Sequence, residues 1–246
     1  LTSLSLVING SNNTALGFEA GANLAGHSNT AIGAQALSQG AGSDIISNVA
    51  IGAQSLFNCT EEENVAVGHQ ALFGLGIGRG NTGLGHRSGM QISGGGDNVT
   101  IGRNSGLGLS GESNIVAIGQ DSVAANVGDD SIGIGTGALV NPGIDNIAIG
   151  RTAMNSAPLT FNDAIAIGRD SMAGGGTDAI AIGRGSMPQL SGQGNIAIGS
   201  NAMDAPGLGA NSNICIGQDA LSLGGNIIGD ENIAIGFRTA QLAPGG

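Results

Sequence analysis

The sequence predicts an all-β protein, a parallel β-solenoid of about 14 coils with 15–19 residues in each coil. Three observations lead to this prediction. A short motif that ends in glycine recurs along nearly the whole chain, and the residues before this glycine alternate in size. The 246 residues also include 48 glycines but only five phenylalanines and no tryptophan or tyrosine, so the interior must be thin and aliphatic. A repeat that covers a chain indicates stacked coils, each in contact with its neighbours.

The motif is clearest at 195–199, which reads Asn-Ile-Ala-Ile-Gly, and it returns unchanged at 146–150 and 232–236. We number the positions of each copy from this glycine as zero. The copies predict one solenoid domain over residues 12–242, with residues 1–11 as an N-terminal cap or joint and residues 243–246 as the C-terminal end. The structural glycines at position 0 are Gly17, Gly33, Gly52, Gly68, Gly85, Gly102, Gly119, Gly135, Gly150, Gly168, Gly183, Gly199, Gly217 and Gly236.

The first element expected in each coil is a short strand from position −3 to position −1, for example residues 196–198. Position −3 is Thr, Val or Ile, position −1 is mostly Ile, and position −2 is Ala in ten of the fourteen copies. Side chains that alternate with a period of two lie on opposite faces of a strand. We expect the large residues to fill the thin core. The small row at position −2 then packs against another layer, for which a second chain is the candidate.

The glycine at position 0 is expected to turn the chain, in a role that needs a positive φ or a close neighbouring backbone. Position +3 is small and position +4 is usually Leu or Met, which predicts a second short strand. A loop of variable length then leads to the next copy. In repeat proteins such insertions collect on one side, which is often the binding side.

The composition excludes several classes of partner. A formal charge of −11 argues against a nucleic-acid backbone or an anionic membrane surface. No apolar run approaches the ~20 residues of a membrane helix. Cys215 replaces the alanine at position −2, so we expect it to be a small buried residue, whereas Cys59 lies in a connecting loop. The two lie too many coils apart for a disulfide, which needs Cα atoms within about 7 Å.

Two charged rows form a candidate ladder. Arginines recur at position +1, and acidic residues recur at position −5. Like charges stacked at strand spacing repel, so each row needs opposite charge nearby. Either the rows face each other, within one chain or between chains, or each is solvated independently. The arginines are Arg103, Arg151, Arg169 and Arg184, and the acidic residues are Glu63, Asp97, Asp130, Asp145, Asp163, Asp178 and Glu231.

No catalytic residue, cofactor site or metal site is predicted. His69 and His86 occupy position +1 of adjacent coils and are expected to stack about 5 Å apart, but no carboxylate or cysteine completes a ligand set. We expect surface or interface histidines and no enzymatic activity. The alternative is a trimeric acyltransferase, because residues 32–37 fit the unit of the hexapeptide-repeat enzymes. Those enzymes have three such units per coil, whereas this chain has one at irregular spacing.

The unit Asn-[TVI]-Ala-Ile-Gly-x-x-[AS]-[LM] resembles the head repeat of YadA-like trimeric autotransporter adhesins, and related repeats occur in phage and viral tail fibres. The resemblance covers roughly residues 12–241. It implies a left-handed parallel β-roll, three copies of which associate side by side into a homotrimer. It also implies that the row at position −2 lies in a tightly packed layer of that trimer.

The function expected from the resemblance is that of a structural and adhesive fibre segment on a virion or cell surface. Such a segment attaches to a host receptor or glycan through loops displayed in several copies, with no membrane insertion and no nucleic acid. A phage-type tail fibre is favoured by the irregular repeat length and by the lack of an anchor barrel and a coiled-coil stalk. The head domain of a bacterial trimeric autotransporter adhesin is the alternative.

Overall fold

The computed structural model describes residues 10–39, 45–124, 127–140, 143–155, 161–172, 174, 176–188, 192–204, 209–222 and 229–239. These residues form an all-β parallel β-solenoid without a helix. Of the two ends expected as caps or joints, residues 1–9 and 243–246 lie outside the described residues. The chain divides into two compact units, Leu1–Asp129 and Asp130–Gly246, and each is described by itself.

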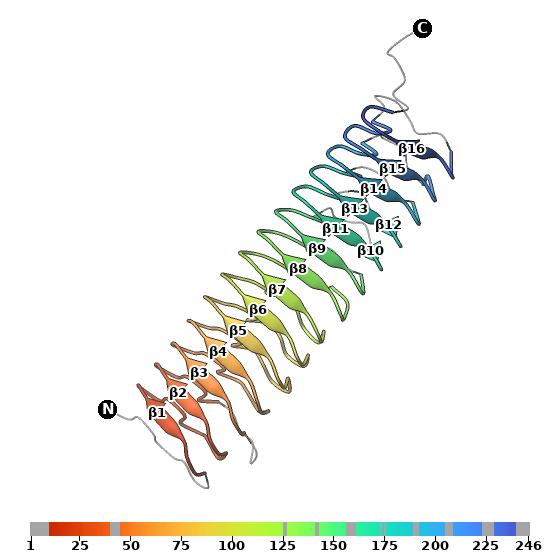
Figure 1. Ribbon diagram of the computed structural model, residues 1–246. Coiled ribbons are helices and arrows are strands. Elements are labelled where there is room, and N and C mark those ends of the chain that lie inside the picture. Colours follow the sequence, from red (N-terminus) through yellow and green to blue (C-terminus); the bar gives the residue numbers. More distant parts are fainter. Residues whose placement is uncertain are drawn as a thin grey trace. The chain divides into compact units, whose positions relative to one another are not determined.

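In its described residues the first unit contains seven short strands that pair in parallel, each with the next along the chain (Figure 1). The pairing joins equal positions of neighbouring copies, so that Thr14 pairs with Thr30 and Ala15 with Ala31. The strands are β1 (Thr14–Leu16), β2 (Thr30–Ile32), β3 (Val49–Ile51), β4 (Val65–Val67), β5 (Thr82–Leu84), β6 (Val99–Ile101) and β7 (Val116–Ile118).

The described residues of the second unit repeat this arrangement and add two short strands that pair with each other. In its main sheet Ala166 pairs with Ala148 on one side and Ala181 on the other. The main strands are β8 (Ile132–Ile134), β9 (Ile147–Ile149), β11 (Ile165–Ile167), β13 (Ile180–Ile182), β14 (Ile196–Ile198), β15 (Ile214–Ile216) and β16 (Ile233–Ile235), and the added pair is β10 (Phe161–Asn162) with β12 (Gly176–Thr177).

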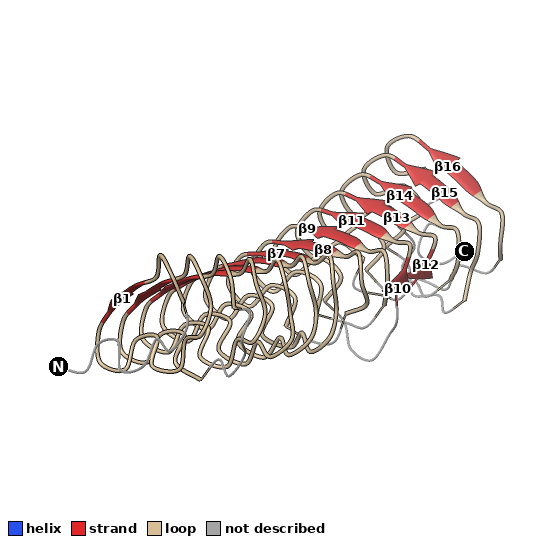
Figure 2. Ribbon diagram, turned by 90° about the horizontal axis from the view of Figure 1, so that it is seen from below, coloured by secondary structure: helices blue, strands red, loops and turns tan. Residues whose placement is uncertain are grey.

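The prediction of a strand at positions −3 to −1 is confirmed in all fourteen copies. Each main strand is three residues long and ends directly before its repeat glycine. Within each unit the strands lie side by side along one side of the coils, and turns and loops form the rest of each coil (Figure 2). Because the register joins equal positions, each kind of residue forms a row that runs from coil to coil.

The expected assignment of the two strand faces is wrong. The small residues at position −2 point into the coil, where Ala31, Ala66 and Ala166 are fully buried. The large residues at positions −3 and −1 point outward instead, and Leu84 and Ile167 are 45% and 37% exposed. The physical reason is the width of the coil. The Leu and Met side chains at position +4 already fill the interior, and only a small residue fits opposite them.

One coil shows how the interior volumes are matched. At Gly83, which is at position −2 of β5, an added Cβ would lie 2.7 Å from Cγ of Leu72 at position +4 of the preceding coil. At position −2 of β6 the larger Thr100 is buried, and both facing +4 positions are glycines, Gly89 and Gly106. A larger residue from the strand thus accompanies smaller residues from the turns, as close packing of the interior requires.

The expected second strand at positions +3 and +4 is also wrong. These residues lie in turns, and the +4 residue has left-handed backbone angles, with φ of 47° at both Leu56 and Leu72. A leucine in this region costs about 1–2 kcal/mol, so the surrounding structure must hold it there. Bonds between coils do so: the backbone N–H of Leu72 donates to the carbonyl of Ser88 at 2.9 Å, and the Leu72 side chain is fully buried.

Candidate interaction surface

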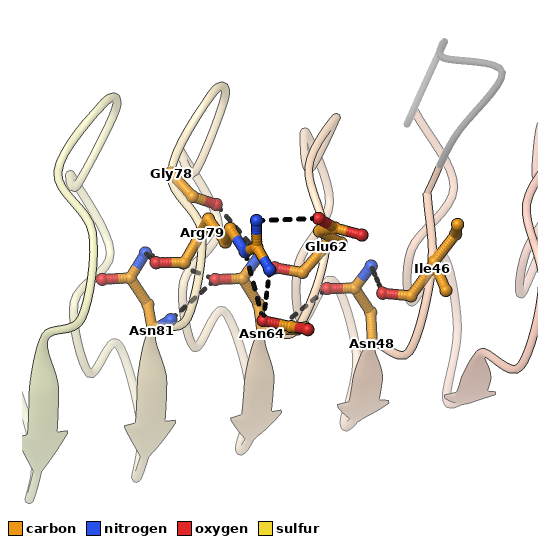
Figure 3. Close-up of polar contacts among 8 residues, drawn as sticks. Ile46, Asn48, Glu62, Asn64, Gly78, Arg79 and Asn81 are labelled. Carbon is orange, nitrogen blue, oxygen red and sulfur yellow. Dashed lines mark hydrogen bonds and ion pairs between the residues drawn. The ribbon is translucent and has the colours of Figure 1, made fainter.

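A ladder of buried asparagines at position −4 holds the beginning of the strands together. Asn64 is fully buried, and its Oδ1 accepts a hydrogen bond from the backbone N–H of Asn81 in the next coil, at 2.8 Å. Its Nδ2 donates to the carbonyl of Gly78, also in the next coil, at 2.9 Å. Figure 3 shows these contacts of Asn64. Asn48 and Asn81 make the equivalent contacts with the coils that follow them. One side chain therefore satisfies two backbone groups of the neighbouring coil.

Four copies have another residue at position −4, namely Ile115, Ser131, Ala164 and Ala179. At Ala164 the backbone connects the coils directly, because Phe161 pairs with Gly176 in the short strands β10 and β12. If residue 164 were asparagine, its side-chain amide would donate a hydrogen bond to the carbonyl of Gly176. The sequence shows that asparagine recurs at position −4, but it does not show which group the side chain binds. The carbonyl of Gly78 that accepts from Asn64 lies 14 residues further along the chain.

Beside the ladder, Arg79 binds two acidic residues of the preceding coil. Its guanidinium lies 3.0 Å from Glu62 and 2.9 Å from Glu63, and all three residues are on the surface (Figure 3). The hydrogen bond to Glu63 and the charges of both carboxylates raise the pKa of the already basic Arg79 guanidinium. Glu63 is one of the predicted acidic row, so in this coil the row receives its counter-charge from a loop. Such exposed pairs contribute little to stability, because solvent screens them.

The predicted histidine stack is confirmed. The rings of His69 and His86 are 5.3 Å apart between centroids and 14° from parallel, and both side chains are exposed. His27 is exposed elsewhere, with Nδ1 3.0 Å from the backbone N of Ser11. Within the described ranges, no group of three or more His, Cys, Asp or Glu side chains is placed to hold a metal ion. The stack is therefore a pair of surface side chains brought together by the register.

The residues at positions −3 and −1 form one continuous outward surface in each unit, which we call the apolar strand face. It consists of Ile, Val, Leu and Thr side chains, all of them partly or largely exposed. In the second unit eight isoleucines of β9, β11, β13 and β14 follow one another in register. Single exposed aliphatic residues are ordinary, but contiguous apolar patches of this kind mark interaction sites.

The predicted charged residues border the apolar strand face. The aspartate row (Asp97, Asp145, Asp163 and Asp178) lies just before the strands, and the arginine row (Arg103, Arg151, Arg169 and Arg184) lies just after them. Asp130 occupies the same position before β8. Arg169 contacts its sequence neighbour Asp170, with Nε 3.7 Å from the carboxylate. Among the described residues, no ion pair joins the two rows within the chain, and a pairing between chains stays a prediction.

Both cysteines are fully buried and free, as expected for Cys215. Cys215 lies in β15 between Ala197 and Ala234 of the neighbouring strands. Cys59 donates from Sγ to the carbonyl of Glu61 at 3.3 Å. Burial raises the pKa of the Cys59 thiol to about 11 and that of the Cys215 thiol to about 12.

We therefore expect both thiols of the folded protein to resist alkylation and disulfide exchange. A rise of two pKa units lowers the reactive thiolate fraction about 100-fold, and burial blocks access as well. Reaction with a chromogenic disulfide at pH 8 should be at least about 100-fold slower in the native protein than in guanidinium chloride. Rapid reaction of two thiols per native chain would contradict the burial of these residues.

Comparison with protein-family models, with curated proteins and with solved structures finds no match to this chain. Over the residues that the structure describes, there is also no helix with the length and apolar character needed to cross a membrane. The arrangement on the surface is thus the main guide to function: an apolar strand face, a charged row along each of its edges, and variable loops elsewhere.

Proposed function

We propose that this chain is a structural and adhesive fibre segment, built as a left-handed β-roll that associates side by side into a homotrimer. The segment belongs to a virion, as in a phage-type tail fibre, or to a cell surface. It attaches to a host receptor or glycan through its loops, which three chains display together. The proposal includes no catalytic step, cofactor or metal.

The observation that carries the proposal is the exposure of the apolar strand face. Burying apolar surface contributes about 25 cal/mol per Å², and a lone chain leaves whole rows of isoleucine in water. The interior of each coil is narrow and consists mostly of Ala, Leu, Met and Asn side chains. Side-by-side association covers the outward rows and supplies the apolar burial that such a thin interior lacks.

The loops supply the second argument. The strands and glycines repeat with little change, whereas the loops between copies vary in length and sequence. Surface loops on a rigid scaffold are the usual carriers of recognition. Three copies on one fibre raise the overall avidity without requiring strong individual contacts.

Replacement of Ile167 by Asp tests the proposal. Ile167 lies in β11 on the apolar strand face, where a carboxylate would be buried between chains without a partner. By light scattering, the unaltered protein should have about three times the chain mass of 23.8 kDa, and Ile167→Asp should run near the single-chain mass.

The matched control is Ile77→Asp, because Ile77 is 71% exposed in a loop outside the apolar strand face. This variant should keep the oligomer. Binding to an array of cell-surface glycans should fall for Ile167→Asp, through lost avidity, and persist for Ile77→Asp. An unaltered protein of single-chain mass at all concentrations would overturn the proposal.

A further inference from the structure

The charges at the two edges of the apolar strand face are matched copy by copy. All four copies with an arginine at position +1 have an aspartate at position −5: Asp97 with Arg103, Asp145 with Arg151, Asp163 with Arg169, and Asp178 with Arg184. Six other copies are uncharged at both positions, at 12 and 18, 28 and 34, 47 and 53, 114 and 120, 194 and 200, and 212 and 218. Two copies carry an acid opposite an uncharged residue, at 130 and 136 and at 231 and 237. The remaining two copies have a histidine at position +1, His69 opposite Glu63 and His86 opposite Gly80. The charge at one edge is thus closely tied to the charge at the other.

Contacts among the residues that the structure describes do not explain this match. Asp163 and Arg169 lie at opposite ends of β11 and are separated by five residues. At about 3.3 Å per residue, the two positions are too far apart for a direct ion pair. Arg169 contacts Asp170 instead, and the described residues offer Arg151 and Arg184 no ion pair.

The arginines also stand close together. The strands β9, β11 and β13 are adjacent and in register, so Arg151, Arg169 and Arg184 follow one another at the strand spacing of about 4.8 Å. The ladder of backbone bonds continues through these residues, since the N–H of Asp170 donates to the carbonyl of Arg151 at 3.0 Å. All three side chains are exposed. Three like charges at this spacing repel unless acidic groups lie opposite them.

A second copy of the chain supplies those groups. When apolar strand faces gather around a threefold axis, the ends of the strands in one chain lie beside the beginnings of the strands in the next. Such a head-to-tail interface closes into a ring, and it brings the arginine row of each chain to the aspartate row of its neighbour. This arrangement rests on the proposed homotrimer.

The isolated pair in the first unit determines the axial register. Asp97 and Arg103 flank β6, and the adjacent copies have Gly80 and Asn114 at position −5. A shift of one coil between chains would place Arg103 opposite one of these uncharged residues. Only parallel chains without an axial shift bring every arginine of the row to an aspartate.

We propose that the aspartate row and the arginine row form an ionic seam between neighbouring copies, which sets the chains parallel and in register. The seam lies beside the apolar contact and selects one arrangement among several that the apolar strand face alone would allow. Complementary charges at an interface act chiefly in this way, by fixing register and excluding alternatives.

Charge reversal in one coil tests the seam. Arg169→Asp places two carboxylates opposite each other at all three interfaces, and the concentration for half-dissociation should rise at least tenfold at low salt. Adding Asp163→Arg in the same chain restores complementary charges and should restore the unaltered value. Adding Asp178→Arg instead, one coil away, should restore nothing and weaken the oligomer further. Sedimentation over a dilution series measures all four proteins.

The aspartate positions have left-handed backbone angles, with φ of 52° at Asp163, and arginine tolerates this conformation, as Arg87 and Arg238 show at 55° and 53°. Asp163→Asn is the control that removes charge without changing the backbone preference, and it should weaken the oligomer less than Arg169→Asp. If Arg169→Asp leaves the dissociation of the trimer unchanged, the ionic seam is overturned but the proposed function is not. Equal rescue by Asp163→Arg and Asp178→Arg would overturn the in-register pairing. A single-chain mass for the unaltered protein would overturn both proposals.

Discussion

Replacement of Gly68 by Ala is expected to destabilise the first unit by at least about 3 kcal/mol. Gly68 has a φ of +136°, a region that residues with a side chain rarely adopt. A Cβ there would lie 2.4 Å from the carbonyl oxygen and 2.7 Å from the carbonyl carbon of Gly85, the repeat glycine of the next coil. Neither neighbour is a flexible side-chain tip, so the backbone of two coils would have to move apart.

The matched control is Gly111→Ala, in the same unit. A Cβ at Gly111 meets nothing within 4 Å, and its φ lies outside the left-handed range. Its effect should stay within about 0.5 kcal/mol. Urea unfolding of the two variants and the unaltered protein, followed by circular dichroism, provides the comparison. Equal midpoints for Gly68→Ala and the unaltered protein would show that the coils are not packed backbone to backbone at the repeat glycine.

The strand positions and the turn at glycine were predictable because each depends on residues close together in the sequence. The alternation around Ala166 reveals a strand, and the recurrence of Gly168 reveals a conformation open only to glycine. Register then placed His69 beside His86. Each of these predictions needed only the period of the repeat and the geometry of a strand.

The orientation of the strand was not predictable by the same reasoning. For a chain that folds alone, the large Ile165 and Ile167 are expected to be buried in preference to the small Ala166. The structure reverses this order because Met172 of the following turn is buried inside the coil and leaves room only for alanine opposite the turns. The left-handed turn at Leu72 was missed for a related reason. Leucine disfavours that conformation, and only the hydrogen bonds between coils and the burial of its side chain hold it there.

Replacement of Asn64 by Ala is expected to cost about 2–4 kcal/mol, because it leaves two buried backbone groups without partners. The N–H of Asn81 would lose its acceptor, and the carbonyl of Gly78 would lose the amide that donates to it. Asn64 is fully buried, so water would not easily replace the side chain. A methyl group in its place also leaves a small cavity, which adds to the cost.

Asn58→Ala provides the control, since Asn58 is exposed in a loop of the same unit. Its backbone N–H donates to the carbonyl of Phe73, and this bond does not depend on the side chain. Urea unfolding should show a loss for Asn64→Ala and almost none for Asn58→Ala. Hydrogen exchange sharpens the test, because the N–H of Asn81 should lose protection in Asn64→Ala before its neighbours in β5 do. Unchanged protection at Asn81 would show that the buried asparagine does not carry the bond between the coils. If protection is lost, the recurring asparagine contributes to the bonding between coils as the strands do. The strands are only three residues long, and the fold then depends on this side chain to bind backbone groups that lie outside them.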